Sequence, residues 1–274
     1  MPQLLLDAGE PVAGRPTVVA YPPAGSGTEY FHDWIPLVSP ELNLLPVRLP
    51  GRQDLWDRAP AEDLGEITGL LAEEIAQRPD TELILLGICT GGLMAYDLAH
   101  RLRERRAGNV RALVLNGTPL PETAAGGLVR RYDAEQPFLW QAASKVLRDY
   151  YDTAESGEFP AEEASGDEDG DEAWQAVLMD EVWQLAEPRI RADIRATEIH
   201  SYASQPLDAP IVTIRGEADD VVPLEEAQGW AAHTRGRFTL RQLTGGHFLM
   251  ADRKAEFARE LLAVGRALGG PAGS

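Results

Sequence analysis

The chain has little cysteine and many fewer basic than acidic side chains. Cys89 is the one cysteine among 274 residues, so the chain cannot form an internal disulfide. With 25 Lys and Arg against 44 Asp and Glu, the formal net charge is −19, which argues against nucleic acid as a partner. The sequence shows no apolar run that approaches a membrane span and no signal-peptide pattern at its start. We therefore expect a cytoplasmic protein with neither a nucleic-acid nor a membrane partner.

Short apolar segments alternate with amphipathic segments along most of the chain. We predict strands at residues 17–21, 42–47, 82–86, 111–115, 211–215 and 238–243. We predict helices at residues 63–76, 92–103 and 251–268. This alternation is typical of an α/β fold with a mostly parallel sheet and helices on both faces. Pro46 cannot donate a backbone hydrogen bond, which favours an edge position or an early end for the second strand.

The segment between Asn116 and Pro210 departs from this alternation. It holds helix-like stretches at 138–151, 174–186 and 190–201, and an acidic run at 162–172. The acidic run predicts a solvated loop and lacks the spacing of a calcium-binding loop. We interpret residues 119–205 as a helical lid inserted into one domain that spans residues 1–274. Such a lid lies over the C-terminal strand ends, where parallel sheets bind ligands.

Cys89 stands in a sharp turn between a predicted buried strand and a predicted amphipathic helix. The turn reads Gly87-Ile88-Cys89-Thr90-Gly91, a G-x-S-x-G nucleophile elbow with sulfur in place of oxygen. Glycines flank the nucleophile because a Cβ on either side of this strained turn would clash. The N-terminus of the following helix favours a thiolate. A free cysteine is often only a small buried hydrophobe, but this strand–turn–helix setting favours a nucleophile in an α/β-hydrolase fold.

Later segments carry a candidate base and a candidate acid for Cys89. His247 follows the last predicted strand, which is the position of the histidine in α/β-hydrolases. Asp219 follows the preceding strand, where a carboxylate would fix the tautomer of His247 and stabilise its imidazolium. Asn116, at the end of the strand after the elbow, is the alternative because an amide also orients the imidazole in Cys-His-Asn sites. Of the two, we favour Asp219.

Backbone N–H groups supply the candidate oxyanion hole. One donor is the N–H of Thr90, the residue after the nucleophile, and the other is the N–H of Ala24, in the turn after the first parallel strand. The sequence shows no metal constellation and no nucleotide or flavin motif. We therefore expect an enzyme that needs neither a metal nor a resident cofactor.

Four segments together resemble the thioesterase family of polyketide and non-ribosomal peptide assembly lines. They are YPPAGSG at 21–27, RLPGR at 48–52, the elbow at 87–91, and GGHF at 245–248. The resemblance runs from Val18 to about Asp252. It implies a substrate delivered as a thioester on the phosphopantetheine arm of an acyl or peptidyl carrier protein. Cys89 stands where most family members have serine, and in this it resembles the Dieckmann cyclases that release tetramate and pyridone products.

Three functional hypotheses follow from these residues and from the resemblance. The leading one is a product-releasing cyclase, in which His247 removes a proton from an acidic carbon and the carbanion closes a ring on the Cys89 thioester. The second is a stand-alone editing thioesterase that hydrolyses stalled acyl chains. The third is a non-catalytic binding protein, against which the intact Cys89, His247 and Asp219 argue. For an acidic carrier, the candidate docking residues are Arg101, Arg103, Arg105 and Arg106.

Overall fold

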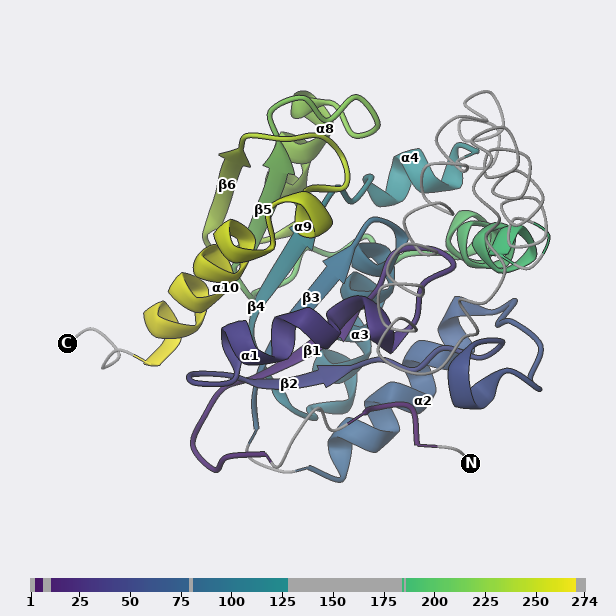
Figure 1. Cartoon of the computed structure of the whole chain (residues 1–274), viewed down its shortest axis with the longest axis horizontal. Coiled ribbons are helices and arrows are strands. Elements are labelled where there is room, and N and C mark those ends of the chain that lie inside the picture. The colour runs from purple at the N-terminus through teal and green to yellow at the C-terminus, as the bar shows by residue number, and fades with distance from the viewer. Residues whose placement is uncertain (1–2, 7–10, 79–80, 128–183, 185, 270–274) are drawn as a thin grey trace, which may run out of the picture.

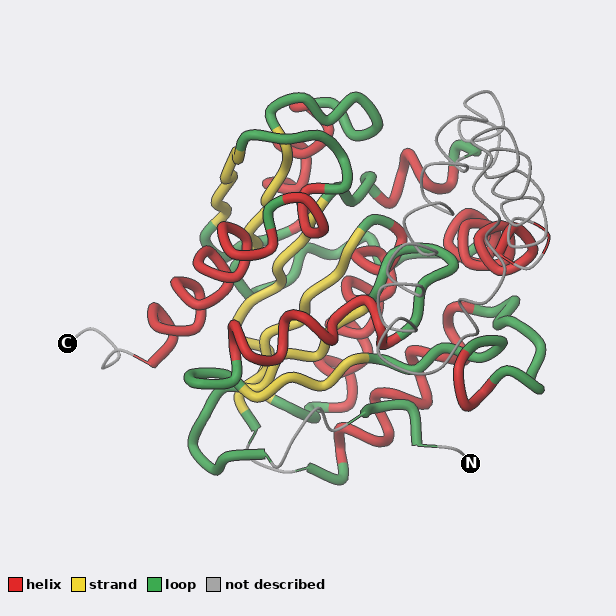
Figure 2. Tube along the Cα trace, viewed as in Figure 1, coloured by secondary structure: helices red, strands yellow, loops and turns green. Residues whose placement is uncertain are grey.

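A single parallel sheet forms the centre of the described protein. The computed structural model describes residues 3–6, 11–78, 81–127, 184 and 186–269. The strands are β1 (Thr17–Tyr21), β2 (Asn43–Pro46), β3 (Glu82–Ile88), β4 (Asn109–Asn116), β5 (Ile211–Gly216) and β6 (Phe238–Leu243). Their order is β2-β1-β3-β4-β5-β6, and every neighbouring pair is parallel. Figure 2 shows the strands in yellow with helices in red around them. The predicted α/β-hydrolase sheet is confirmed, and β2 is an edge strand that ends at Pro46.

Helices cover both faces of this sheet (Figure 1). One face packs against α2 (Leu64–Ala76) and α3 (Thr90–Arg105), and the other packs against α1 (Ile35–Val38), α9 (Leu249–Asp252) and α10 (Lys254–Gly269). Successive strand residues enter opposite cores because side chains alternate across a strand. In β3, for example, Leu85 belongs to the α2–α3 core, whereas Ile84 and Leu86 belong to the α10 core.

The remaining α-helices of the described residues are short or lie within the range predicted for the lid. They are α4 (Pro121–Ala125), α8 (Leu224–Gly229) and a helix that includes residues 186–199. The helix expected at 251–268 is divided into α9 and α10 around Arg253. The helix expected at 190–201 is present, but it ends at residue 199. The helix predicted at 138–151, the acidic run 162–172 and nearly all of 174–186 lie outside the described residues, so the lid at 119–205 stays a prediction.

Close backbone contacts hold the turn between β3 and α3. A Cβ built on Gly87 would lie 2.2 Å from the Cα of Gly92 and 2.5 Å from the carbonyl oxygen of Gly91. Neither backbone atom can move aside as a flexible side chain does, so the strand and the helix can approach this closely only at a glycine.

Within the described residues, no helix combines the length and the apolar character needed to cross a membrane.

We predict that Gly87→Ala destabilises the protein strongly, whereas Gly69→Ala in α2 does not. Overpacking against backbone should cost at least about 3 kcal/mol at Gly87. The nearest atom to a Cβ on Gly69 is the end of the Arg101 side chain at 3.9 Å, so alanine there should stabilise the helix by roughly 0.5–1 kcal/mol. Urea unfolding of both variants measures the difference, and equal stabilities would contradict this account of the elbow.

Candidate active site

The candidate residues meet at the C-terminal edge of the sheet. Cys89 directly follows β3 and has φ 53° and ψ −122°, a conformation that costs energy for any residue other than glycine. Backbone hydrogen bonds hold it there: its N–H donates to the Asn116 carbonyl at 2.8 Å, and its own carbonyl accepts from the Gly92 N–H at 3.0 Å. The elbow predicted from the sequence is therefore present, and strand pairing holds its strained residue in place.

His247 lies between Cys89 and Asp219. Its Nδ1 is 3.1 Å and 3.2 Å from the two carboxylate oxygens of Asp219, and the ring is also hydrogen-bonded to Cys89. Burial alone would lower the pKa of His247. The hydrogen bonds and negative charges of Asp219 and Cys89 outweigh burial and raise this pKa to about 10. The site therefore favours an imidazolium facing the sulfur.

Backbone groups fix the carboxylate of Asp219. Its Oδ1 accepts hydrogen bonds from the N–H groups of Val221 and Val222, both at 3.0 Å. Arg215 Nη2 donates to the carbonyl of Asp219 at 2.8 Å. Burial opposes ionisation, but His247 and the two N–H groups together hold the pKa of Asp219 below its usual range. Asp219 is therefore an ionised and oriented partner for the imidazole.

Asn116, the alternative partner, has its side-chain amide directed elsewhere. Its Nδ2 donates to the Ile214 carbonyl of β5 at 2.9 Å, while its backbone carbonyl receives the N–H of Cys89. The residue in contact with the ring is its neighbour Gly117, which has φ 52°. A Cβ on Gly117 would lie 2.7 Å from Cε1 of His247. No local sequence pattern predicted this contact of Gly117 with His247.

The loop after β1 lies directly against the elbow. A Cβ on Gly91 would be 2.4 Å from the carbonyl oxygen of Pro22, so the loop that carries Ala24 reaches the first turn of α3. The Ser26 N–H donates to the Pro23 carbonyl at 3.1 Å and Gly25 has φ 80°, as in a type II turn. Ala24 thus belongs to a turn in the loop whose Pro22 carbonyl lies against Gly91 of the elbow. The oxyanion hole formed by the N–H groups of Ala24 and Thr90 stays a prediction.

The four arginines predicted to dock a carrier are largely engaged within the protein. Arg101 Nε pairs with Asp97 at 2.6 Å, Arg103 Nη1 donates to the Pro206 carbonyl at 3.0 Å, and Arg105 Nη2 pairs with Glu73 at 3.3 Å. Arg106, with φ 50°, ends helix α3.

In the described part of the chain, no group of three or more His, Cys, Asp or Glu side chains could hold a metal ion.

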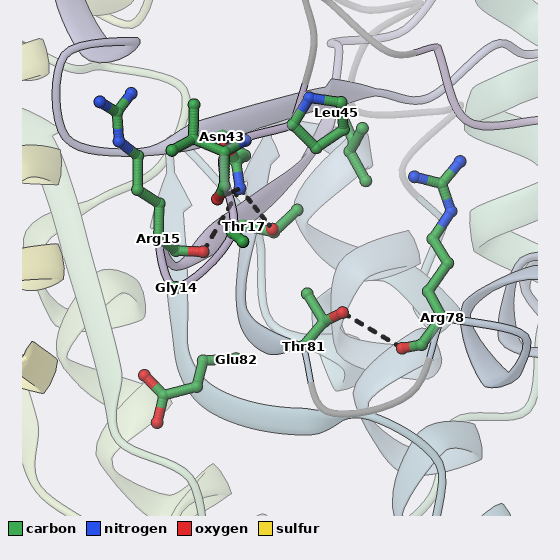
Figure 3. Close-up of a pocket in the computed structure, with 11 residues that line it drawn as sticks. Gly14, Arg15, Thr17, Asn43, Leu45, Arg78, Thr81 and Glu82 are labelled. Carbon is green, nitrogen blue, oxygen red and sulfur yellow. Dashed lines mark hydrogen bonds between the residues drawn. The ribbon is translucent and has the colours of Figure 1, made fainter.

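An open cavity of about 560 Å³ lies at the opposite edge of the sheet. Its lining includes the first residues of three strands, Thr17, Asn43 and Glu82 (Figure 3). Cys89 and Asp219 follow the C-terminal ends of strands, so this cavity is not part of the candidate site. Its lining residues are hydrogen-bonded to one another. For example, Asn43 Nδ2 donates to the Arg15 carbonyl and to the Thr17 hydroxyl.

Comparison with known proteins shows that the chain belongs to the thioesterase domain family. Residues 16–264 match the thioesterase domain family. The "Probable cadicidin biosynthesis thioesterase" of Streptomyces griseus is 28% identical over 243 residues, which are 86% of this chain. Thioesterase PikA5 of Streptomyces venezuelae is 28% identical over 250 residues, or 89% of this chain. The chain spans 58% of the length of the first relative and 79% of the second.

Solved structures with the same architecture include two biosynthetic thioesterases. The type II thioesterase BorB from the borrelidin biosynthetic cluster is 25% identical, with a TM-score of 0.72 over 96% of this chain and 98% of its own. The thioesterase RedJ from the prodiginine pathway in Streptomyces coelicolor is 26% identical, with a TM-score of 0.66 over 94% of this chain and 91% of its own.

We predict that Asp219→Asn slows turnover far more than Asn116→Ala does. Losing the carboxylate should cost roughly 10²-fold or more in kcat, because the imidazolium loses its counter-charge and the ring its orientation. Asn116→Ala keeps the backbone carbonyl that binds the Cys89 N–H, so its effect should be much smaller. Steady-state kinetics on an acyl thioester measures both, and the reverse ranking would assign the orienting role to Asn116.

We also predict a pH-dependent contribution of His247 to stability. The pKa of about 10 in the folded protein exceeds the ordinary unfolded value of about 6.5. The imidazolium therefore stabilises the fold fully below about pH 6.5, and this contribution is lost as the pH rises toward 10. Urea unfolding of the wild type and His247→Gln across this range should show their free-energy difference shifting against the wild type. A constant difference would contradict the raised pKa.

Proposed function

Because the chain belongs to the thioesterase domain family, we propose that it cleaves acyl thioesters held on a carrier protein, with Cys89 as the nucleophile. The observation that carries this proposal is the hydrogen-bonded series Cys89–His247–Asp219 at a strained elbow. A nucleophile, a base in contact with it and an acid that orients the base are the parts that acyl transfer needs. The relationship to biosynthetic thioesterases supports a carrier-bound substrate.

In the proposed acylation step, the sulfur of Cys89 attacks the thioester carbonyl. The tetrahedral oxyanion accepts hydrogen bonds from the N–H groups of Ala24 and Thr90. As the C–S bond to the phosphopantetheine arm breaks, the His247 imidazolium gives its proton to the departing thiolate, which leaves as the free thiol. Asp219 keeps the ring oriented and the imidazolium stabilised throughout. One thioester is exchanged for another, so the step is close to thermoneutral and needs no cofactor beyond the arm that delivers the substrate.

Hydrolysis is the fate of the acyl-enzyme that we propose first. His247, now neutral, takes a proton from a water molecule that attacks the acyl-Cys89 carbonyl, and the products are a free acid and the regenerated thiol. BorB, which matches this chain over nearly its whole length, is described as a type II thioesterase. This relationship favours a stand-alone editing enzyme that clears acyl chains from carriers.

Ring closure is the second candidate, and the identity of residue 89 favours it. A thioester on cysteine keeps more driving force than an ester on serine and reacts readily with carbon nucleophiles. His247 could remove the acidic proton of a β-ketoacyl chain, and the carbanion would displace the sulfur of Cys89 to form a Dieckmann-type tetramate or pyridone ring. Docking of the carrier near Arg101, Arg103, Arg105 and Arg106 stays a prediction under either outcome.

The test uses an N-acetylcysteamine thioester of a β-ketoacyl amino acid, which offers both a hydrolysable carbonyl and an acidic carbon. Intact-protein mass spectrometry should show acylation of the wild type and none of Cys89→Ala, which removes the nucleophile and leaves the fold intact. Product analysis then separates the two fates. Free acid indicates an editing thioesterase, and a ring lighter by one water indicates a cyclase.

Two outcomes would contradict the proposal. Equal turnover by the wild type and Cys89→Ala would exclude the cysteine as nucleophile. Absence of acylation with this thioester and with simple acyl thioesters would favour a non-catalytic binding protein. Cys89→Ser is the matched control, because it keeps the geometry of the elbow while replacing the thioester intermediate with a less reactive oxoester.

A further inference from the structure

A buried ion pair joins two segments that are 141 positions apart in the chain. Arg52, in the loop after β2, donates from Nη2 and Nη1 to the two carboxylate oxygens of Asp193 at 2.7 Å and 2.9 Å. Both side chains are almost fully buried, with 5% and 3% of their surface exposed. Such a bidentate pair is geometrically specific, because the planar guanidinium matches the carboxylate edge to edge.

The pair also holds the backbone of the loop after β1. Asp193 Oδ2 accepts a hydrogen bond from the Gly25 N–H at 2.8 Å, and Arg52 Nη1 donates to the Ser26 carbonyl at 2.7 Å. Gly25 has the left-handed conformation of a type II turn, in which the peptide between the two central residues has a defined orientation. Asp193 binds the N–H of that peptide, which directly follows Ala24. The ion pair therefore fixes the orientation of the turn that carries Ala24.

Further contacts pack the helix at 186–199 against this loop. A Cβ on Gly25 would lie 2.4 Å from Cγ1 of Ile190, so the helix rests directly on the turn. Arg189 donates to the Gly51 carbonyl, and its guanidinium lies 3.7 Å from the ring centroid of Trp56. One face of the helix thus contacts both the loop after β1 and the loop after β2.

We propose that Arg52 and Asp193 are positioning residues that hold the Ala24 N–H in the oxyanion hole and make its geometry depend on the docked helix 186–199. This inference rests on the proposed function, because it needs an oxyanion to form at Cys89. Neither side chain touches the reacting atoms in this arrangement; each acts through the backbone of Gly25 and Ser26. Burying two charges is costly unless their geometry is tightly set, and here that geometry is coupled to the turn beside the elbow.

The proposal separates two reactions of the same sulfur. Attack on a thioester builds negative charge on the carbonyl oxygen, which the Ala24 N–H stabilises. Alkylation by iodoacetamide displaces iodide at a saturated carbon and builds no such oxyanion. Loss of the positioning contacts should therefore slow acylation of Cys89 and leave alkylation unchanged. General damage to the fold or to the Cys89–His247 pair would slow both reactions.

Asp193→Asn is the test, because it keeps the side-chain volume but replaces one accepting oxygen with an NH₂ group. We measure its acylation rate by single-turnover mass spectrometry with an N-acetylcysteamine thioester. The rate should fall roughly 10- to 100-fold, because the Ala24 N–H is displaced rather than removed and removal of a whole oxyanion donor costs about 10²- to 10³-fold. KM should change little. The matched control is Asp208→Asn, whose carboxylate is 72% exposed and pairs with Arg235 on the surface; it should leave both rates unchanged.

Equal loss of acylation and alkylation in Asp193→Asn, or no loss of acylation, would overturn the proposal. If that variant does not fold, Arg52→Lys gives the same comparison, because an ammonium cannot serve both carboxylate oxygens and the Ser26 carbonyl with the fork geometry of arginine. Failure of the proposed function itself is distinguishable: the wild-type protein would then show no acylation at Cys89 to compare.

Discussion

The rest of the site depends on the backbone turn at Cys89. The strand β3 must pass into helix α3 within a few residues, and this places Cys89 in a strained conformation, with φ 53° and ψ −122°. Gly87 lies against the backbone of α3, and Gly91 lies against the carbonyl of Pro22. Because backbone atoms cannot yield, any side chain at these positions would separate the strand, the helix and the loop after β1. The strain at Cys89 is thus supported by close packing at Gly87 and Gly91.

The charged groups around the turn come from positions far apart in the sequence, and hydrogen bonds hold each of them in place. His247 is held between Cys89 and Asp219, and Asp219 is itself held by two backbone N–H groups. In the loop after β1, Asp193 and Arg52 hold the turn that carries Ala24. Each of the two groups therefore contains a buried carboxylate whose orientation is set by hydrogen bonds. The first orients a proton carrier, and we propose that the second orients an oxyanion donor.

Local patterns in the sequence determined most of the architecture. The strand predicted at 238–243 coincides with β6, and Pro46 ends β2 at the edge of the sheet, because a proline lacks the N–H that an inner strand needs. The elbow around Cys89 was recognisable because glycines at fixed spacing report a local steric requirement. His247 could likewise be selected by its place after the last strand. All these features depend on neighbours within a few residues.

Tertiary structure alone decided which distant groups meet. The sequence left Asp219 and Asn116 as alternatives; in the folded protein Asp219 contacts His247, while the Asn116 amide binds the Ile214 carbonyl of the neighbouring strand. Gly117 against the imidazole, and Asp193 against Arg52 and Gly25, had no local signal. The reason is physical: a short-range pattern reports backbone sterics and the burial of a face, whereas a hydrogen bond between residues 141 positions apart exists only once packing has brought both partners together.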